Sequence, residues 1–390
     1  MNKTYTELTG RFGKYYGSPH TSAAYAPGRI EVLGNHTDYN EGFVLSAAID
    51  MGTFFAAAPS PDAACRVVAG DIMEEASFDS RDPSSADVPV WAAYVRGVFA
   101  ELRQRGMPVK GFNGMFLSNL PLAAGLSSSA ALEMSAGLAI SNLQGFRIDK
   151  HELAKAGQSA EHRHVGVKCG LLDQITSLFG RNGCLVMTDF RSFSVKHAPL
   201  PQSGGRTCFL MCDTGVKHNL VESEYNARRE ECARAVEAFS SLLSHPVTAL
   251  RDVSMDEWNQ YSPKLEASAS RRSAHVIGEN TRVLRAQKLL ADGRLADFGA
   301  LMFESHESSR CNFENSCPEL DFLVERAAET EGVLGARLSG GGFGGSAVVL
   351  TRTDSAGDVA RELDKAYEKR FGRSCKTRKV IPSGGASVLA

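Results

Sequence analysis

A run of small residues about a third of the way along the chain has the composition of a phosphate-binding loop. Residues 121–130 read Pro-Leu-Ala-Ala-Gly-Leu-Ser-Ser-Ser-Ala, and apolar residues then recur at helical spacing from Ala130 to Leu143. Small residues ahead of a helix let backbone N–H groups approach a ligand closely, and the helix N-terminus supplies partial positive charge. The motif therefore suits a phosphate group, with an ordinary serine cap at a helix start as the alternative.

A polar turn near the N-terminus carries side chains that suit a sugar. It follows the alternating segment Arg29–Leu33, which predicts a strand with Arg29 and Glu31 on one face. The residues of the turn that can form hydrogen bonds are Asn35, His36, Thr37 and Asp38. Such side chains can bond several hydroxyl groups at once, although a solvated loop would have the same composition.

Two acidic residues further along the chain have positions that suit catalysis or metal binding. Asp173 lies amid apolar neighbours in Cys169–Thr176, and Glu161 precedes it by 12 residues. A carboxylate in such a setting can act as a general base or bind a metal ion. Taken alone, each residue is better explained as a helix cap or a surface carboxylate.

A glycine-rich segment near the C-terminus matches a dinucleotide fingerprint in letters only. Gly340-Gly-Gly-Phe-Gly-Gly345 fits G-x-G-x-x-G, but the next residues, Ser346–Thr351, have a strand pattern rather than a helical one. We therefore reject a Rossmann site and interpret the segment as a loop that enters a strand. The Walker A pattern is also absent from the sequence, which argues against a P-loop kinase.

The elements that must position these residues alternate between strand and helix patterns, which predicts a mixed α and β protein. A second amphipathic helix is expected from about Val221 to Leu243. The pattern changes from helical to strand-like and then to turn-rich between Asp173 and Gly205. We expect two domains, residues 1–190 and 191–390, with the last strands free to return to the first domain.

Composition excludes several classes of partner. Acidic residues outnumber lysine plus arginine by 45 to 43 in 390 residues, so the chain has no overall positive charge to bind nucleic acid. It has no apolar signal core and no apolar run of membrane-spanning length, and we expect a cytoplasmic protein without membrane partners. Its nine cysteines lack C-x-x-C spacing, which suits a reducing compartment.

In their order and separation, these four segments resemble the galactokinase branch of the GHMP kinase superfamily, which also includes homoserine, mevalonate and phosphomevalonate kinases. The likeness covers nearly the whole chain and extends to Asp213–Arg229, Arg251–Val253 and Cys317–Asp321. It implies an α+β fold with a ribosomal-protein-like N-terminal domain, a ferredoxin-like C-terminal domain and an active site between them. It further implies ATP-dependent phosphorylation of the C1 hydroxyl of a monosaccharide, with D-galactose as the first candidate. The sequence does not determine the oligomeric state, for which a monomer is the first expectation.

The resemblance also implies roles for individual residues. Asp173 would be the catalytic base, and Arg29 would stabilise the transferred phosphoryl group. The ATP site would comprise Gly125, Leu126, Ser127, Ser128 and Ser129, with Gly341 and Gly342 at the cleft floor. Mg²⁺ would be held by Ser129 and Glu161. The sugar would be bound by Asn35, His36, Thr37, Asp38, Gly170 and Tyr225.

The chain departs from the family pattern at two sugar-site positions. Glu31 stands at the family's usual asparagine, and Asn35 stands at its usual glutamate. The exchange either compensates for itself or shifts specificity towards galacturonate, arabinose or N-acetylgalactosamine. A second alternative is a non-catalytic sensor of ATP and sugar, which is disfavoured because the chain keeps Ser129, Asp173 and Arg29.

Overall fold

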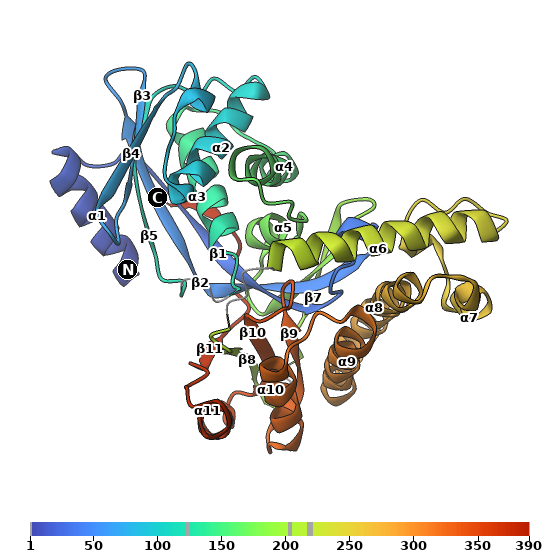
Figure 1. The fold of residues 1–390 in the computed structure, drawn as a ribbon. Coiled ribbons are helices and arrows are strands. Elements are labelled where there is room, and N and C mark those ends of the chain that lie inside the picture. Colours follow the sequence, from blue (N-terminus) through green and yellow to red (C-terminus); the bar gives the residue numbers. More distant parts are fainter. Residues whose placement is uncertain (1, 122–124, 202–204, 217–220, 390) are drawn as a thin grey trace.

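The computed structural model describes residues 2–121, 125–201, 205–216 and 221–389, without the side chains of residues 221 and 222. Part of the serine motif, residues 122–124, and part of the segment Asp213–Arg229, residues 217–220, lie outside the described residues. The chain forms two sheets covered by helices (Figure 1). The predicted mixture of α and β structure is confirmed.

An eight-stranded sheet, counted over the described residues, organises the first half of the chain. Its strands lie in the order β12-β1-β2-β5-β3-β4, and β6 pairs with β2 and β7. The strands are β1 (Ser22–Leu33), β2 (Phe43–Pro59), β3 (Ala64–Ala69), β4 (Glu74–Asp79), β5 (Phe112–Ser118), β6 (Cys184–Asp189), β7 (Ser194–Pro199) and β12 (Ser387–Leu389). The strand β2 is long enough to pair with β5 near one end and with β6 near the other. The final strand, β12, lies beside β1, with Leu389 opposite Ala23.

Helices cover both faces of this sheet. On one face lie α2 (Val90–Gln104), α3 (Ser128–Leu143), α4 (Lys150–Ala160) and α5 (Leu172–Phe179), and on the other lies α1 (Lys3–Tyr16). Successive strand residues point to opposite faces. Phe55 accordingly packs in the core with α2 and α3, whereas Phe54 packs against Leu8 and Phe12 of α1.

A four-stranded antiparallel sheet organises the second half, in the order β11-β8-β10-β9. Its strands are β8 (Thr207–Asp213), β9 (Val333–Ser339), β10 (Ser346–Arg352) and β11 (Arg378–Val380). One face is covered by α10 (Pro318–Glu329) and α11 (Ala356–Phe371). The remaining helices are α6 (Val221–Leu242), α7 (Met255–Tyr261), α8 (Ala267–Ala291) and α9 (Leu295–Ser308).

A shared core joins the two sheets. Ile30 and Val32 of β1 pack in one buried cluster with Phe209 of β8 and Val348 of β10, and α9 contributes Phe298. Because both sheets contribute to a single core, β1 runs directly into the junction between them. The strand that carries Arg29 therefore ends where the two halves of the molecule meet.

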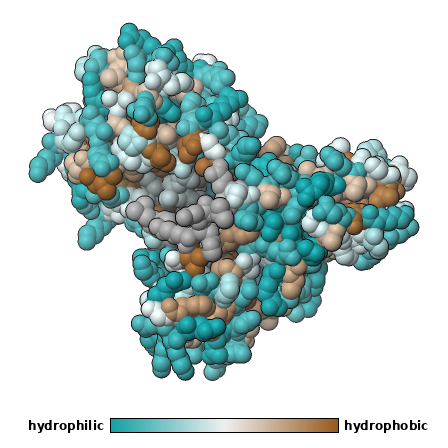
Figure 2. Space-filling model, in the orientation of Figure 1, coloured by the Kyte–Doolittle hydropathy of each residue, from teal (hydrophilic) through white to brown (hydrophobic). Residues whose placement is uncertain are grey.

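The elements predicted around the motifs are present with small shifts at their ends. The helix after the serine motif is α3, the predicted amphipathic helix is α6, and the strand after the glycine loop is β10. The division of the chain at residue 190 stays a prediction. Among the described helices, none has the length and apolar character needed to cross a bilayer. Figure 2 shows hydrophilic residues over most of one face, with small separate groups of hydrophobic ones.

Candidate active site

A cavity of about 370 Å³ lies at this junction, where β1, α5, α6 and the glycine loop after β9 come together (Figure 1). Many of the residues singled out from the sequence line it. These are Arg29, Asn35, His36, Asp38, Gly170, Asp173, Tyr225 and Gly341. Segments separated by up to about 300 residues thus contribute to one concave surface, as an enzyme site for a small molecule requires.

An arginine–carboxylate pair forms one end of the cavity. Arg29 Nε donates to Asp173 Oδ1 at 2.7 Å, and Arg29 Nη2 donates to Asp173 Oδ2 at 2.9 Å. The third nitrogen, Nη1, donates to the carbonyl of Gly125 at 2.6 Å. This two-point contact fixes both side chains. The Arg29 side chain is 8% exposed and that of Asp173 is 26% exposed, so the carboxylate is the more accessible partner.

The serine loop reaches the same pair. Ser127 has a left-handed backbone (φ 57°), a conformation that costs about 1 kcal/mol or more for a residue other than glycine. Its hydroxyl donates to Asp173 Oδ2 and makes no capping bond to α3. The N–H of Arg29 donates to the carbonyl of Leu126 at 3.1 Å, which ties the loop to β1. Ser127 is therefore oriented towards the carboxylate rather than used as a helix cap.

Ser128 and Ser129 open α3 directly beside that loop. Backbone N–H groups in the first turn of a helix have no partner within the helix, and they carry the positive end of its dipole. The start of α3 thus presents donors next to Asp173. This is the arrangement that the sequence predicted for a phosphate site.

Glu161 lies on the far side of Ser129. It begins a π-helical turn, Glu161–Val165, that follows α4, and the Ser129 hydroxyl donates to its Oε1 at 3.2 Å. Burial raises the pKa of Glu161 to about 7, and the nearby charge of Asp173 adds to the shift. Gln174 donates to Oε1 at 3.3 Å. No arginine or lysine hydrogen-bonds this carboxylate among the described residues.

The oxygen ligands at this point suit a magnesium ion that also binds substrate phosphates. Mg²⁺ prefers oxygen ligands and is usually bound by one or two carboxylates together with water and substrate phosphates. Ser129 supplies a hydroxyl and Glu161 a buried carboxylate, next to the start of α3. Over the described residues, no three or more histidine, cysteine, aspartate or glutamate side chains form a group that could hold a metal by themselves. A magnesium ion here would need further ligands, such as water or substrate phosphates.

A second buried acid stands behind Glu161. Glu133 of α3 is fully buried, and burial, reinforced by the charge of Glu161, raises its pKa well above its usual value. Its Oε2 accepts a hydrogen bond from Gln174 at 3.1 Å. Its Oε1 has no partner in the described structure. Sequence reasoning missed this residue, because one glutamate within a helical pattern reads as surface.

The polar turn after β1 forms the other end of the cavity. His36 Nε2 donates to the carbonyl of Gly341 at 3.1 Å, and His36 Nδ1 accepts from the Tyr39 hydroxyl at 2.8 Å. Burial lowers the pKa of His36 to about 3, so the ring is neutral near pH 7. Because a carbonyl can only accept, the proton must be on Nε2. Both ring nitrogens are therefore used: Nε2 holds the turn against the glycine loop, and Nδ1 bonds Tyr39 within the turn.

Asp38 and Gly170 are matched in shape. A Cβ atom on Gly170 would lie 1.5 Å from Asp38 Oδ2, so no other residue fits at this position without moving the carboxyl group. Burial raises the pKa of Asp38 to about 7, and the charge of Glu31 adds to the shift. The carboxyl group lines the cavity, where it can hydrogen-bond a ligand hydroxyl.

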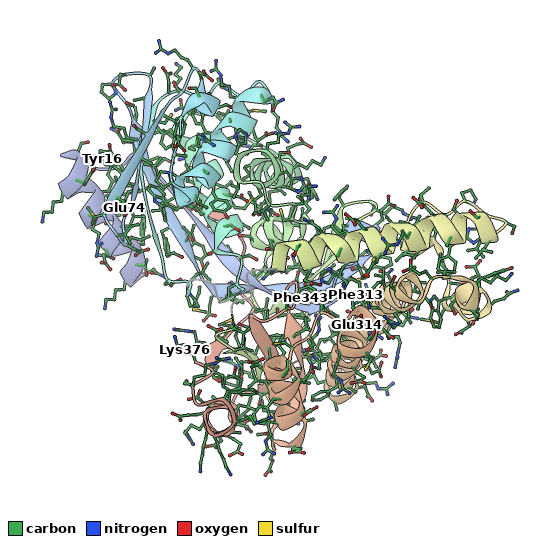
Figure 3. All side chains as sticks on the ribbon, in the orientation of Figure 1. Tyr16, Glu74, Phe313, Glu314, Phe343 and Lys376 are labelled. Carbon is green, nitrogen blue, oxygen red and sulfur yellow. The ribbon has the colours of Figure 1, made fainter. Side chains whose placement is uncertain are left out.

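Tyr225 enters the cavity from α6, and α6 is anchored three residues later. Arg228 donates to the carbonyls of Phe313 at 2.8 Å and Glu314 at 3.0 Å, and its guanidinium lies 5.6 Å from the centre of the Phe343 ring. Figure 3 shows Phe313, Glu314 and Phe343 close together beside α6. The Tyr225 ring lies 5.0 Å from that of His36.

Eight residues assigned to the site do not line the cavity. They are the predicted nucleotide and metal residues Gly125, Leu126, Ser127, Ser128, Ser129 and Glu161, together with Thr37 and Gly342. Thr37 is fully buried, and its hydroxyl lies 2.7 Å from the carbonyl oxygens of both Gly34 and Phe43. Gly342 packs against Asn315, whose carbonyl would lie 2.1 Å from an added Cβ atom. In this structure Thr37 and Gly342 shape the backbone around the cavity instead of facing it.

A buried polar network supports the sugar end of the cavity. Glu279 of α8 accepts from the N–H groups of Gly34 at 2.7 Å and Asn35 at 2.9 Å, and Arg282 donates to it. Arg337 of β9 is fully buried and donates to Glu31 at 3.1 Å. Arg337 had a signal in the sequence, since it is a charged residue inside an apolar strand pattern. Glu279 had none, because its helix is rich in polar residues.

Comparison with known proteins places these features in a family. The galactokinase galactose-binding signature matches residues 10–59, the GHMP kinase N-terminal domain matches residues 93–181, and the GHMP kinase C-terminal domain matches residues 286–369. A galactokinase of Chloroflexus aurantiacus is 38% identical over 381 residues, which cover 98% of this chain and 96% of that protein. A galactokinase of Roseiflexus sp. strain RS-1 is 40% identical over 369 residues, covering 94% and 93%.

Solved structures give the same result. The structure of Lactococcus lactis galactokinase complexed with galactose superimposes with a TM-score of 0.93 at 30% identity, covering 99% of this chain and all of that one. A mevalonate kinase of Methanococcus jannaschii, at 18% identity, has a TM-score of 0.63 over 94% of this chain and 99% of its own. The latter likeness extends to the fold alone. The predicted two-domain GHMP kinase fold is confirmed.

Proposed function

The chain belongs to the galactokinase family of GHMP kinases, a family of sugar kinases that use ATP, and we propose that it transfers the γ-phosphoryl group of ATP to the C1 hydroxyl of D-galactose. The observation that carries this proposal is the convergence of Arg29, Asp173 and Ser127 at one end of a sugar-sized cavity. These residues come from three separate elements, and nothing in local structure requires them to meet.

In this reaction Asp173 accepts the proton of the C1 hydroxyl. The hydroxyl oxygen forms a bond to the γ-phosphorus, and the bond from that phosphorus to the bridging oxygen breaks as ADP leaves. Asp173 suits the role because it lines the cavity and is the more exposed member of its ion pair. Arg29 stays protonated throughout and contributes positive charge next to the group being transferred.

ATP is held by the loop from Gly125 to Ser129 and by the start of α3. Transfer of a phosphoryl group depends mainly on in-line positioning and on neutralising the charge of its oxygens. Mg²⁺, when bound by Ser129 and Glu161, supplies part of that charge. The backbone donors of the α3 N-terminus supply another part, and they hold the phosphates within reach of Arg29.

Galactose is the proposed acceptor because the galactose-binding signature spans β1 and the polar turn. His36, Asp38 and Tyr225 surround the space beyond Asp173 and offer a neutral imidazole, a carboxyl group and an aromatic ring. A sugar presents both hydroxyl groups and apolar C–H faces, so this mixture of contacts suits it.

The direct test is release of ADP with a panel of sugars, namely galactose, galacturonate, arabinose, N-acetylgalactosamine and glucose, followed by ³¹P NMR of the product. Galactose should give the highest kcat/KM, with the phosphate on the anomeric carbon. Phosphate on another carbon would contradict the C1 assignment. If ADP appeared with none of the sugars, the chain would be a sensor rather than a kinase.

A further inference from the structure

Glu31 lines the cavity but has no role in the proposed phosphoryl transfer. It lies two residues after Arg29 on β1 and therefore on the same face of the strand, roughly 7 Å further along. It lines the cavity although it is only 3% exposed. A carboxylate this deeply buried is costly unless its oxygens have partners.

Only one of its two oxygens has partners in the described protein. Oε1 accepts from Asn35 Nδ2 at 2.8 Å and from Arg337 Nη1 at 3.1 Å. Both donors are buried, so they hold the carboxylate in one orientation. No protein donor within the described residues reaches Oε2, which leaves that oxygen as an acceptor in the cavity wall.

Asn35 has no free amide hydrogen to donate to a ligand. One N–H of its amide donates to Glu31, and the other donates to the carbonyl of Gly340 at 2.7 Å. Its Oδ1 accepts from Asn315 at 2.9 Å. The amide is thus used to orient Glu31 and to join β1 to the glycine loop.

We propose that Glu31 is a specificity residue, which accepts a hydrogen bond from a sugar hydroxyl on the ring edge opposite C1 and excludes sugars that carry a carboxylate there. The inference rests on the proposed function, since it takes C1 to lie at Asp173. An acceptor that is held by two donors at Oε1 recognises a hydroxyl at Oε2 with little reorganisation. A uronate would instead place its negative charge against Glu31.

This role of Glu31 predicts which sugars the protein accepts. The sugar end of the cavity takes a neutral sugar with a donating hydroxyl and disfavours galacturonate. Arabinose, which lacks the exocyclic carbon of a hexose, should be accepted less well than galactose if that hydroxyl is the one bonded. Glu31 therefore recognises the edge of the sugar opposite the reacting C1 hydroxyl.

Glu31→Gln tests the proposal, with galacturonate assayed both as a substrate and as a competitor of galactose. We expect kcat/KM for galactose to fall about 10- to 100-fold, mainly through KM, as for loss of a charged hydrogen-bond partner. The preference for galactose over galacturonate should fall by about 10-fold or more, because the repelling charge is gone. The KM for ATP should stay within about twofold, since ATP lies at the other end.

Two further variants separate recognition from stability. Glu31→Asp keeps the charge beside Arg337 and shortens the side chain, so it should weaken galactose binding yet retain the discrimination against galacturonate. Glu101→Gln is the matched control, because Glu101 is 1% exposed, bonds Arg105 and lies outside the cavity. It should change neither sugar KM nor preference. Melting temperatures of all three variants report any loss of folding.

An unchanged preference and an unchanged galactose KM in folded Glu31→Gln would overturn the proposal and leave Glu31 as a structural partner of Arg337. Failure of the proposed function looks different, because wild-type protein would then release no ADP with galactose. A wild-type enzyme that preferred galacturonate would also overturn the assignment of Glu31, while leaving phosphoryl transfer in place.

Discussion

The carboxyl groups buried behind the two ends of the cavity have different hydrogen-bond partners. At the sugar end, Glu279 is bonded by Arg282, and Glu31 is bonded by Arg337. Burial would raise the pKa of Glu279, but Arg282 opposes it and the pKa lies below its usual range. At the nucleotide end, Glu133 and Glu161 are bonded by Gln174 and not by an arginine, and burial raises the pKa of both.

The difference indicates which charge a ligand must supply at each end. Glu279, which has Arg282 as its partner, keeps its charge whatever is bound and orients the backbone N–H groups of Gly34 and Asn35. A buried carboxyl group without a cation retains a proton near neutral pH, and a bound cation favours its release. The protein thus supplies the counter-ion of Glu279, whereas no arginine or lysine of the described residues hydrogen-bonds Glu133 or Glu161, and a bound cation would supply that charge. Glu31 and Asp38 differ from Glu279 in pKa. Burial prevails over Arg337 and Arg29 and raises the pKa of Glu31, and burial raises the pKa of Asp38 to about 7.

The largest effect is expected where the two ends meet. Asp173→Asn removes the base but preserves size, so kcat should fall by about 10²- to 10⁴-fold, the range of general-base catalysis. ATP affinity, measured by titration calorimetry, should be nearly unchanged. Retention of most turnover would show that positioning alone drives the reaction, and Asp173 would lose its assigned role.

Glu279→Gln tests the ion pair that supports the sugar end. Glu279 is fully buried and bonds Arg282 together with two backbone N–H groups. Removing its charge leaves a guanidinium without a counter-ion, so the free energy of unfolding should fall by about 3–5 kcal/mol. Urea denaturation measures this loss, with Glu101→Gln as the comparison. An exposed ion pair contributes roughly 1 kcal/mol or less. A loss below about 1 kcal/mol would therefore contradict the view that ion pairs stabilise the sugar end.

Arg29→Lys keeps the charge between the two ends but removes the fork. A lysine cannot contact both oxygens of Asp173 and the Gly125 carbonyl as Arg29 does. We expect kcat to fall roughly 10²-fold, comparable to loss of one donor that stabilises a transition state. Steady-state kinetics at saturating ATP and sugar give the value. A full-rate enzyme would mean that only the charge matters.

Glu161→Gln tests whether Glu161 binds Mg²⁺ at the nucleotide end. The Mg²⁺ concentration for half-maximal activity should rise by at least about 10-fold, a loss that even outer partners of a metal site produce. In metal-free protein the folded state holds a proton on Glu161 up to a pH of about 7, while the unfolded state releases it near 4.5. The free energy of unfolding should therefore fall as the pH rises between these values.

The variant should lose part of that pH dependence, since glutamine does not titrate. Urea denaturation of wild type and Glu161→Gln in metal-free buffer, at several values between about pH 4.5 and 7, measures the difference. Asp38, Glu133 and Glu31, whose pKa values are also raised, remain in both proteins and provide the background slope. Identical slopes in the two proteins would rule out a proton on Glu161.

The smallest effect is expected at Thr37. Thr37→Val removes a buried hydroxyl that bonds backbone carbonyls of the sugar-end turn, so stability should fall by about 1–3 kcal/mol. The sugar KM should change by no more than about twofold, since the side chain does not line the cavity. A large rise in sugar KM without a matching loss of stability would return Thr37 to the set of sugar ligands.

Much of the site was predictable because its motifs are local. The serine run begins α3, the alternating residues form part of β1, and the glycine run leads into β10, each as its own sequence indicates. The partners of these motifs were harder to predict. Glu133 and Glu279 lie in helices whose patterns reveal burial of the helix but not the ligand or partner of one side chain.

The sequence by itself determined which segments carry donors, acceptors and small residues, because periodicity and turn chemistry depend on neighbours within a few positions. Only the tertiary structure decided that Arg29 contacts Asp173, 144 residues away, and that the Thr37 side chain is buried. It also decided that the Asn35 amide donates to Glu31 and Gly340. Such pairings depend on how two sheets pack into one core. The direction of a side chain there is set by distant neighbours, which no local pattern specifies.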